Sequence, residues 1–429
     1  MAEPKNTSYW LDTAPEFAGS ARHELLGEKF DVAVVGGGFT GLSTALELAN
    51  RGAKVAVLEA GRVVGGASGR NGGQCNNGLA HDFASLAASI GREKALYFYS
   101  SYVEAVNTVE RLVKEYNIEC DFRRCGRLKL AAKPEHFEKL EKSFEILQDG
   151  IDENVELIAP EKIQDEIGSK FFHGGLLQST SAQMHVGRFG VGLAEVAVKK
   201  GVRIFENAQV SRYNRLSKGG YKLDISGHNL TAKQILVATG GHGKSPFGWF
   251  RRRIVPVGSF AVVTKPLEKD LLDKLFPTRR NYVTSKNIGN YFLVTPDDRL
   301  LFGGRAKFST SNAKSDAEAA DTLSAMLGQT FPDLSGIELD HCWGGQVDMT
   351  QDRLPRAGEK DGIFYAMGYS GHGVQMSIHM GPIMADVMEG KVDANPWRDL
   401  GWPAIPGYFG KPWFLPIVGA YYRLQDYLH

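Results

Sequence analysis

The stretch Asp31-Val-Ala-Val-Val-Gly-Gly-Gly-Phe-Thr-Gly41 decides the fold of this chain. Its first five residues are almost all apolar, which is typical of a short strand covered on both faces. Gly36, Gly38 and Gly41 then follow with the spacing GxGxxG at the start of a predicted helix. Lys54-Val-Ala-Val-Leu-Glu59 is a second buried strand. Together these segments predict a βαβ unit and a parallel sheet.

This unit predicts a dinucleotide-binding site. Gly36 permits the tight turn after the strand, Gly38 lets a pyrophosphate approach the backbone, and Gly41 lets the helix and strand pack closely. The N-terminus of the helix offers free N–H groups and the positive end of its dipole to the phosphates. Glu59, at the end of the second strand, is placed to accept hydrogen bonds from the adenosine ribose hydroxyls. The unit alone does not distinguish NAD from FAD.

Three later segments extend the predicted site. The loop Val64-Gly-Gly-Ala-Ser-Gly-Arg-Asn-Gly-Gly73 is so rich in small residues that a flat ring system can lie against its backbone, although a plain surface loop has the same composition. Residues 235–241 form a strand that runs into Thr-Gly-Gly, a second place for close backbone approach. Residues 368–373 open a helix whose N-terminal N–H groups favour the negative charge of a reduced flavin.

Composition excludes several classes of protein. The chain has 429 residues, with 50 Lys and Arg against 49 Asp and Glu, so a nucleic-acid partner bound by a broad basic surface is not expected. Its four cysteines form no CxxC pair, which argues against a metal site and fits a reducing cytoplasm. We expect no secretory signal at the N-terminus and no membrane span in the glycine-interrupted stretch 30–46, hence a cytoplasmic protein.

The order of the segments predicts an α/β (overall α+β) protein of two interleaved domains. Residues 1–29 are expected to be an exposed arm. Rossmann-type pieces at 30–85, 150–242 and 340–429 would form one discontinuous domain around the dinucleotide. The pieces 86–149 and 243–339, rich in helix and in β-like segments respectively, would form a second domain of mixed β-sheet plus helices.

The chain resembles the D-amino-acid-oxidase-like family of FAD-dependent oxidoreductases, and within it the subgroup of bacterial gamma-glutamylputrescine oxidases. The resemblance spans residues 30–428 and is carried by these stretches: Asp31–Gly41, Val57–Ala60, Gly66–Gln74, Leu300–Gly304, Gly368–Val374 and Tyr421–Leu428. It implies FAD in a Rossmann-like domain of the glutathione-reductase type, with a substrate domain built on a mixed sheet over the flavin. It also implies oxidation of an amine C–N bond by hydride transfer to flavin N5, giving an imine that water hydrolyses to a carbonyl compound.

The motifs and the resemblance together give a set of cofactor-binding residues. They are Gly36, Gly38, Phe39, Thr40, Gly41, Glu59, Ala60, Ser68, Arg70, Asn71, Gly72, Gly73, Gln74, Thr239, Gly240, Gly371, His372, Gly373 and Val374. Some relatives bind flavin covalently through a cysteine just before a Thr-x-Asp segment. At the equivalent spacing this chain has Gly345, and Cys342 lies further upstream, so we expect non-covalent FAD.

Four residues are candidates for the catalytic site, each with a plainer alternative. His372 contributes either its backbone or its side chain, and Trp343 either walls the substrate pocket or is an ordinary core residue. Arg305 either binds a substrate carboxylate bidentately or is a solvated strand-end charge. Tyr291 either lines the pocket or is an ordinary strand aromatic.

Two further residues are weaker candidates. Tyr282 has the same two interpretations as Tyr291. His185 matches a family histidine before the second cofactor helix, for which we expect a structural role.

One departure from the family bears on the substrate. Sarcosine oxidases of the family carry a carboxylate-binding lysine two residues after Gly-His-Gly, where this chain has Gln375. That favours an amine or an amide-bearing amine, with dioxygen or another acceptor taking the electrons. The alternatives are a dehydrogenase of N-substituted or cyclic amino acids such as pipecolate, which Arg305 would favour, and a non-catalytic FAD-binding assembly protein.

The C-terminal tail, residues 403–429, combines prolines and aromatic residues with a short amphipathic helix. We expect it either to pack on the FAD domain or to make a weak peripheral contact with a membrane surface, where electrons would pass to a membrane acceptor.

Overall fold

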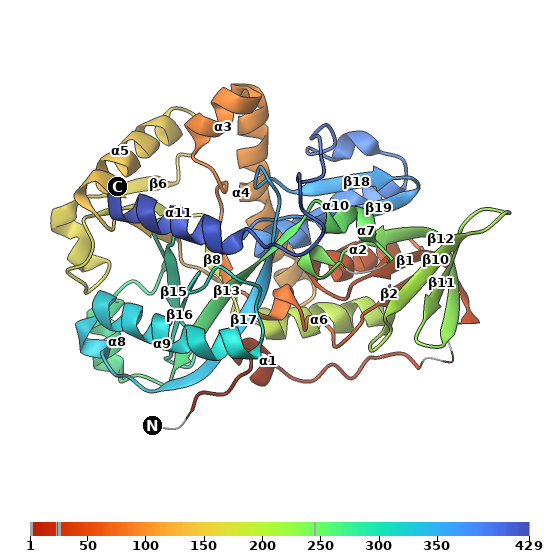
Figure 1. Ribbon diagram of the computed structural model, residues 1–429, viewed down its shortest axis with the longest axis horizontal. Helices are drawn as coiled ribbons and strands as arrows, with labels where there is room; N and C mark the ends of the chain where they lie inside the picture. The colour runs from red at the N-terminus through yellow and green to blue at the C-terminus, as the bar shows by residue number, and fades with distance from the viewer. Residues whose placement is uncertain (1–2, 23, 25–26, 244–245, 429) are drawn as a thin grey trace.

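The computed structural model describes residues 3–22, 24, 27–243 and 246–428 and consists of two large sheets, a small one and surrounding helices (Figure 1). The longer helices are α2 (Phe39–Asn50), α3 (Phe83–Ile90), α4 (Arg92–Glu115), α5 (Pro134–Gln148), α6 (Val186–Lys199), α9 (Ala313–Thr330), α10 (Gly373–Met388) and α11 (Leu415–Leu428). The shorter ones are α1 (Tyr9–Asp12), α7 (Gly248–Arg251) and α8 (Lys269–Leu275).

The first large sheet contains the predicted βαβ unit. Its order is β10 (Val210–Arg215), β11 (Tyr221–Ile225), β12 (His228–Val237), β1 (Lys29–Val35), β2 (Val55–Leu58) and β9 (Arg203–Phe205), and β19 (Ile363–Met367) pairs with β12 and with β18 (Arg356–Lys360). β1 is parallel to both β2 and β12, and β12 is parallel to β19. The expected parallel sheet around the glycine-rich turn is therefore confirmed.

Helices bury one face of this sheet. α2 packs against α6 and α10, and α10 also packs against α4 (Figure 1). The Ser43 hydroxyl of α2 donates a hydrogen bond of 2.7 Å to the carbonyl of Ile378 in α10, so the two helices lie very close together. Their apolar faces join the buried strand residues in one core, which fixes both helix N-termini at the same edge of the sheet.

One face of the second large sheet is turned toward the first large sheet, and the other face is covered by α8 and α9. Its order is β17 (Leu339–Met349), β13 (Val255–Thr264), β16 (Leu300–Gly304), β15 (Asn290–Val294), β14 (Asn281–Thr284), β5 (Arg127–Leu130), β7 (Gly175–Gln178) and β6 (Val155–Ile158). Phe292 and Phe302 pair across β15 and β16 and pack into the core with α8 and α9. Because side chains alternate along a strand, their neighbours Tyr291 and Gly303 face the other way.

The second large sheet takes strands from distant parts of the chain. Its strands β6 and β7 lie within 150–242, and its strand β17 begins at Leu339 and ends at Met349. A small sheet of β3 (Gln74–Cys75), β8 (Ala182–Gln183) and β4 (Arg123–Arg124) joins the two halves. β17 pairs along its whole length with β13, so its position is dictated by pairing rather than by the Rossmann-type segment that follows it.

The N-terminal arm is not exposed throughout, which corrects the expectation for residues 1–29. Tyr9, Trp10 and Leu11 are buried, with Trp10 only 1% exposed. The Trp10 indole donates to the carbonyl of Asn71 at 2.7 Å, and the Ser8 hydroxyl donates to that of Gly69 at 2.6 Å. The aromatic residues of the arm therefore hold the glycine-rich loop 64–73 in place.

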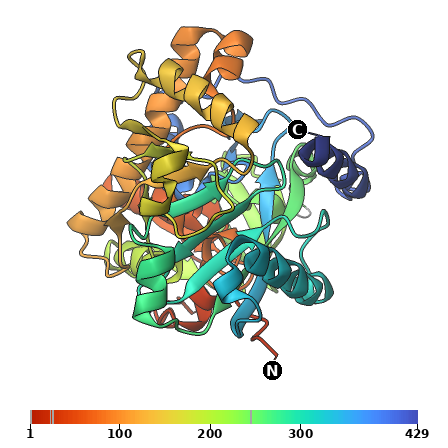
Figure 2. The same cartoon turned by 90° about the vertical axis from the view of Figure 1, so that its left-hand side faces the viewer.

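The C-terminal helix α11 lies at the edge of the molecule in Figure 2, where its residues contact the Asn287–Ile288 turn and Phe308. Leu415 is buried, and Gly419 packs so closely on Phe308 that an added Cβ would lie 2.6 Å from the ring. The tail thus packs mainly beside the second large sheet, with Leu415 in one cluster with Val255, Val257 and Phe308. Within the described residues, no helix has the length and apolar character needed to cross a membrane.

Candidate functional site

A cavity of about 920 Å³ lies between the two large sheets. It is lined by the glycine-rich turn after β1, the loop 64–74, the segment after β12 and the N-terminus of α10. The facing side comes from β5, β15, β16 and β17, together with one residue of α11. Segments far apart in the sequence therefore meet as the motifs predicted.

Most of the predicted site residues line this cavity. Of the cofactor set these are Gly36, Gly38, Phe39, Thr40, Glu59, Ala60, Ser68, Arg70, Asn71, Gly72, Gln74, Thr239, Gly240, Gly371, His372, Gly373 and Val374. Of the catalytic candidates, His372, Arg305 and Tyr291 line it. Gly41, Gly73 and Trp343 do not.

The turn into α2 has the geometry that its glycines require. Gly36 has a φ of +114°, and an added Cβ would lie 2.6 Å from the carbonyl oxygen of Ala238. A Cβ on Gly41 would lie 2.0 Å from the carbonyl oxygen of Gly36. Gly41 therefore acts behind the site, by letting α2 approach the strand, as its place in the motif predicts.

Glu59 stands at the end of β2, beside this turn. Its two carboxylate oxygens accept hydrogen bonds from the backbone N–H groups of Gly37 and Gly61, each at 2.8 Å. These bonds fix the orientation of the carboxylate. Each oxygen keeps a further lone pair for a ribose hydroxyl.

The loop 64–73 is fixed by its own polar side chains. Ser68 accepts a hydrogen bond of 3.0 Å from the N–H of Phe39 at the start of α2. Asn71 accepts a bond of 2.9 Å from the N–H of Gly73 and donates to the carbonyl of Ser68 at 2.7 Å. Arg70 donates to the carbonyls of Gly65 and Gly344, both at 3.1 Å. The loop is therefore held in place by hydrogen bonds and forms one wall of the cavity. It is not the plain surface loop that its composition also allowed.

Trp343 does not line the cavity; it has the core position that was the alternative to a pocket wall. The residue is 1% exposed, and its indole N–H donates to the carbonyl of Arg70 at 3.0 Å. It packs in the core because β17, the edge strand of its sheet, pairs along its length with β13, and this pairing directs Trp343 toward the loop 64–73. Gly73 is likewise behind the cavity, where it packs against Trp10. Both residues support the loop 64–73.

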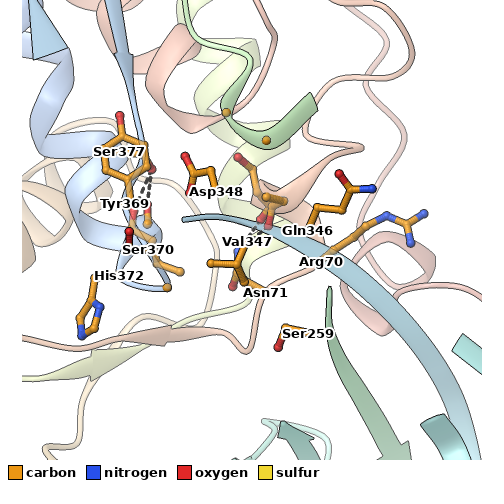
Figure 3. A pocket seen from close by; sticks show the side chains of 18 of the residues that line it. Arg70, Asn71, Ser259, Gln346, Val347, Asp348, Tyr369, Ser370, His372 and Ser377 are labelled. Carbon is orange, nitrogen blue, oxygen red and sulfur yellow. Dashed lines mark hydrogen bonds between the residues drawn. The ribbon is translucent and has the colours of Figure 1, made fainter. Parts of the chain in front are cut away.

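His372 precedes α10 and faces the cavity with a neutral ring. Burial, helped by the charge of Arg127, lowers the pKa of His372 to about 3. Its Nδ1 is buried and has no hydrogen-bond partner among the described residues, and the same holds for the hydroxyl of Thr239. Figure 3 shows His372 and Ser370 on the loop before α10. The two unpartnered polar atoms lie where a bound ligand would supply their missing hydrogen-bond partners.

Tyr291 of β15 lines the cavity on the side that faces the loop 64–73. An added Cβ on Gly303 would lie 2.3 Å from its ring, and one on Gly72 would lie 2.5 Å from it, so the ring lies between two glycines. Its hydroxyl is 3.3 Å from that of Ser259. Arg305, just after β16, lines the cavity without a hydrogen bond or ion pair to any described residue.

Tyr282 and His185 have structural positions. Tyr282 is fully buried and stacks on Phe292 in the core beneath α8 and α9, so it does not line the cavity. His185 caps α6, where its Nδ1 accepts a hydrogen bond of 3.1 Å from the N–H of Arg188. Burial lowers the pKa of His185 to about 4, in line with its expected structural role.

Sequence reasoning missed several polar residues of the cavity. Asp348 of β17 faces the loop before α10 in Figure 3 and accepts a hydrogen bond of 2.6 Å from the N–H of Gly368. Burial raises the pKa of Asp348 to about 6. Arg127 and Lys129 of β5 also line the cavity. The alternation Arg-Leu-Lys-Leu at 127–130 was the available signal, because it marks a strand with one polar face.

Comparison with known proteins agrees with this geometry. The model of the family described as FAD dependent oxidoreductase (DAO) matches residues 31–387. The chain belongs to this family. It is 31% identical to gamma-glutamylputrescine oxidoreductase of Escherichia coli K12 over 98% of both chains. It is 32% identical to a probable oxidoreductase, OrdL, of Haemophilus influenzae over 85% of this chain and 84% of that one.

A solved structure supports the fold. Glycine oxidase from Geobacillus kaustophilus superimposes with a TM-score of 0.70, covering 89% of this chain and 98% of that one at 22% identity. The members of the family are FAD-dependent oxidoreductases, so this chain is an FAD-dependent enzyme.

The residues of the cavity fit FAD. The N-terminus of α2 and the carboxylate of Glu59 lie at one end, as the ADP half requires. A Cβ on Gly38 would lie 2.9 Å from the Ser68 hydroxyl, so a larger residue at position 38 would fill the space between the turn and the loop 64–73. The buried, unpartnered atoms of Thr239 and His372 supply hydrogen-bonding groups that the protein itself does not satisfy. This cavity is therefore the candidate site for FAD.

Proposed function

We propose that the protein oxidises the C–N bond of an amine to an imine, which water hydrolyses to a carbonyl compound. We further propose that the substrate is gamma-glutamylputrescine or a closely similar acylated amine. The observation that carries this proposal is the similarity to gamma-glutamylputrescine oxidoreductase over 98% of both chains. FAD supplies the hydride acceptor when it is bound.

The chain's own residues would bind and orient such an amine. Tyr291, whose ring lies between Gly72 and Gly303, would pack against the bound amine on the β15 side of the cavity. Burial raises the pKa of Asp348 to about 6, which brings this carboxyl close to the range in which it can exchange a proton with an amine. Its Oδ2 accepts from the N–H of Gly368, and the ionised carboxylate would attract the substrate ammonium and accept its proton, so that the reacting amine is neutral. The neutral ring of His372 adds no positive charge that would repel the amine.

The experiment is an anaerobic titration of the purified yellow protein, followed at the visible flavin band. We expect gamma-glutamylputrescine to bleach the band and air to restore it. Bleaching by pipecolate or proline instead, with slow recovery in air, would contradict the proposal and indicate a dehydrogenase. Absence of bleaching by every amine tested would favour a non-catalytic FAD-binding protein.

We also propose that FAD is held without a covalent bond. All four cysteines are buried, and none of them lines the cavity. Acid precipitation is therefore expected to release the flavin into the supernatant. A pellet that stays yellow after repeated washing would contradict this. A cytoplasmic location is proposed from cysteine usage alone.

A further inference from the structure

Three polar side chains meet in the part of the cavity beside α11. They are Arg305, just after β16, Arg353, in the loop between β17 and β18, and Tyr422, on α11. Nη2 of Arg353 donates a hydrogen bond of 3.0 Å to the hydroxyl oxygen of Tyr422. The C-terminal helix therefore contributes directly to the lining of the cavity.

Positively charged side chains outnumber negatively charged ones in this lining. The lining includes six cations, Arg70, Arg127, Lys129, Lys286, Arg305 and Arg353, but among the described residues only two carboxylates, Glu59 and Asp348. Both carboxylates are already bonded to backbone N–H groups of the cofactor-domain segments. Burial and the nearby charge of Arg353 lower the pKa of Arg305. Two guanidinium groups without a carboxylate between them are unfavourable until an anion binds.

The helix that carries Tyr422 is firmly anchored. The carboxylate of Asp426 accepts hydrogen bonds of 2.8 Å from the N–H groups of Asn287 and Ile288. The Tyr422 ring stacks on Phe308 with 6.1 Å between ring centroids. Arg353 has a φ of +54°, a conformation that is costly for a side-chain-bearing residue. The site is therefore organised before any ligand arrives.

We propose that Arg305, Arg353 and Tyr422 form a subsite for a carboxylate at the end of the substrate remote from the oxidised amine. This rests on the proposed function and names the substrate class: an amine whose far end carries a carboxylate. Each guanidinium can donate two parallel hydrogen bonds to a carboxylate. Since the Tyr422 oxygen accepts from Arg353, its own hydrogen is free to donate to the same anion. A diamine such as putrescine would place its second ammonium against two guanidinium groups and be rejected.

The test uses the FAD-loaded enzyme and glutarate, a dicarboxylate with no C–N bond to oxidise. Glutarate binding is followed by the change in the flavin absorption spectrum and by calorimetry. We expect Tyr422→Phe, which keeps the ring stacked on Phe308, to weaken binding about tenfold, as for loss of one hydrogen bond to a charge. Arg353→Lys keeps the charge but loses the planar fork, and it should weaken binding at least as much.

Matched controls lie next to the test residues. Tyr421 and Arg423 are exposed on the same helix, so Tyr421→Phe and Arg423→Lys should leave the glutarate affinity unchanged. Equal glutarate affinity in Tyr422→Phe, Arg353→Lys and the unmodified enzyme would overturn the subsite. If the two variants lose glutarate but no acylated amine bleaches the flavin, the proposed function fails and the subsite stands.

Discussion

At the scale of single residues, Asp348 has a testable effect on stability. Its folded-state pKa of about 6 lies above the value of about 3.9 for an unfolded chain, so the folded state loses stability as pH rises through 6. Asp348→Asn removes the buried charge. In FAD-free protein it should raise the free energy of unfolding at pH 8 by on the order of 1 kcal/mol, and the gain should vanish toward pH 4. Thermal unfolding at both pH values measures this, with exposed Asp399→Asn as the control. A gain that is equal at pH 4 and pH 8 would show that burial of the charge is not the cause.

At the scale of elements, the contact between β1 and α2 depends on Gly41. Because a Cβ there would lie 2.0 Å from the carbonyl oxygen of Gly36, Gly41→Ala must push α2 away from the strand. We expect FAD affinity to fall at least tenfold, measured by the recovery of flavin fluorescence on dilution. Gly248→Ala in α7 meets no atom within 4 Å and should bind FAD normally. Normal FAD affinity in Gly41→Ala would mean that the helix N-terminus is not a phosphate site.

The same elements show what the sequence could and could not predict. The βαβ unit was predictable because its strand, turn and helix are neighbours in sequence. Asp348 and Tyr422 were not, because their positions depend on pairings and contacts with distant segments. Trp343 illustrates the difference: its sequence neighbourhood is glycine-rich, but pairing with Ala261 of β13 directs it into the core behind the loop 64–73.

At the scale of the whole molecule, one surface remains without a partner among the described residues. On the outer side of α11, Ile417, Tyr421, Leu424 and Leu428 follow one another at helical spacing and are 55–64% exposed. Trp413 is 66% exposed on the segment before the helix. Lys411 and Arg423 are exposed beside these residues, and the guanidinium of Arg252 lies 5.0 Å from the ring of Phe409. Apolar and aromatic side chains next to cations are typical of contact with an anionic lipid surface.

We therefore expect the protein to sediment with phosphatidylserine vesicles at low salt, and much less with phosphatidylcholine vesicles or at high salt, because screening weakens the contribution of the cations. Changing Trp413 and Ile417 together to Ser should abolish sedimentation, since both side chains are among the most exposed apolar groups of the tail. Val392→Ser, at an exposed apolar position outside the tail, should not. The membrane contact is wrong if the protein does not sediment with either kind of vesicle. If size-exclusion chromatography then shows a dimer that the double change dissociates, a second copy of the chain covers this face.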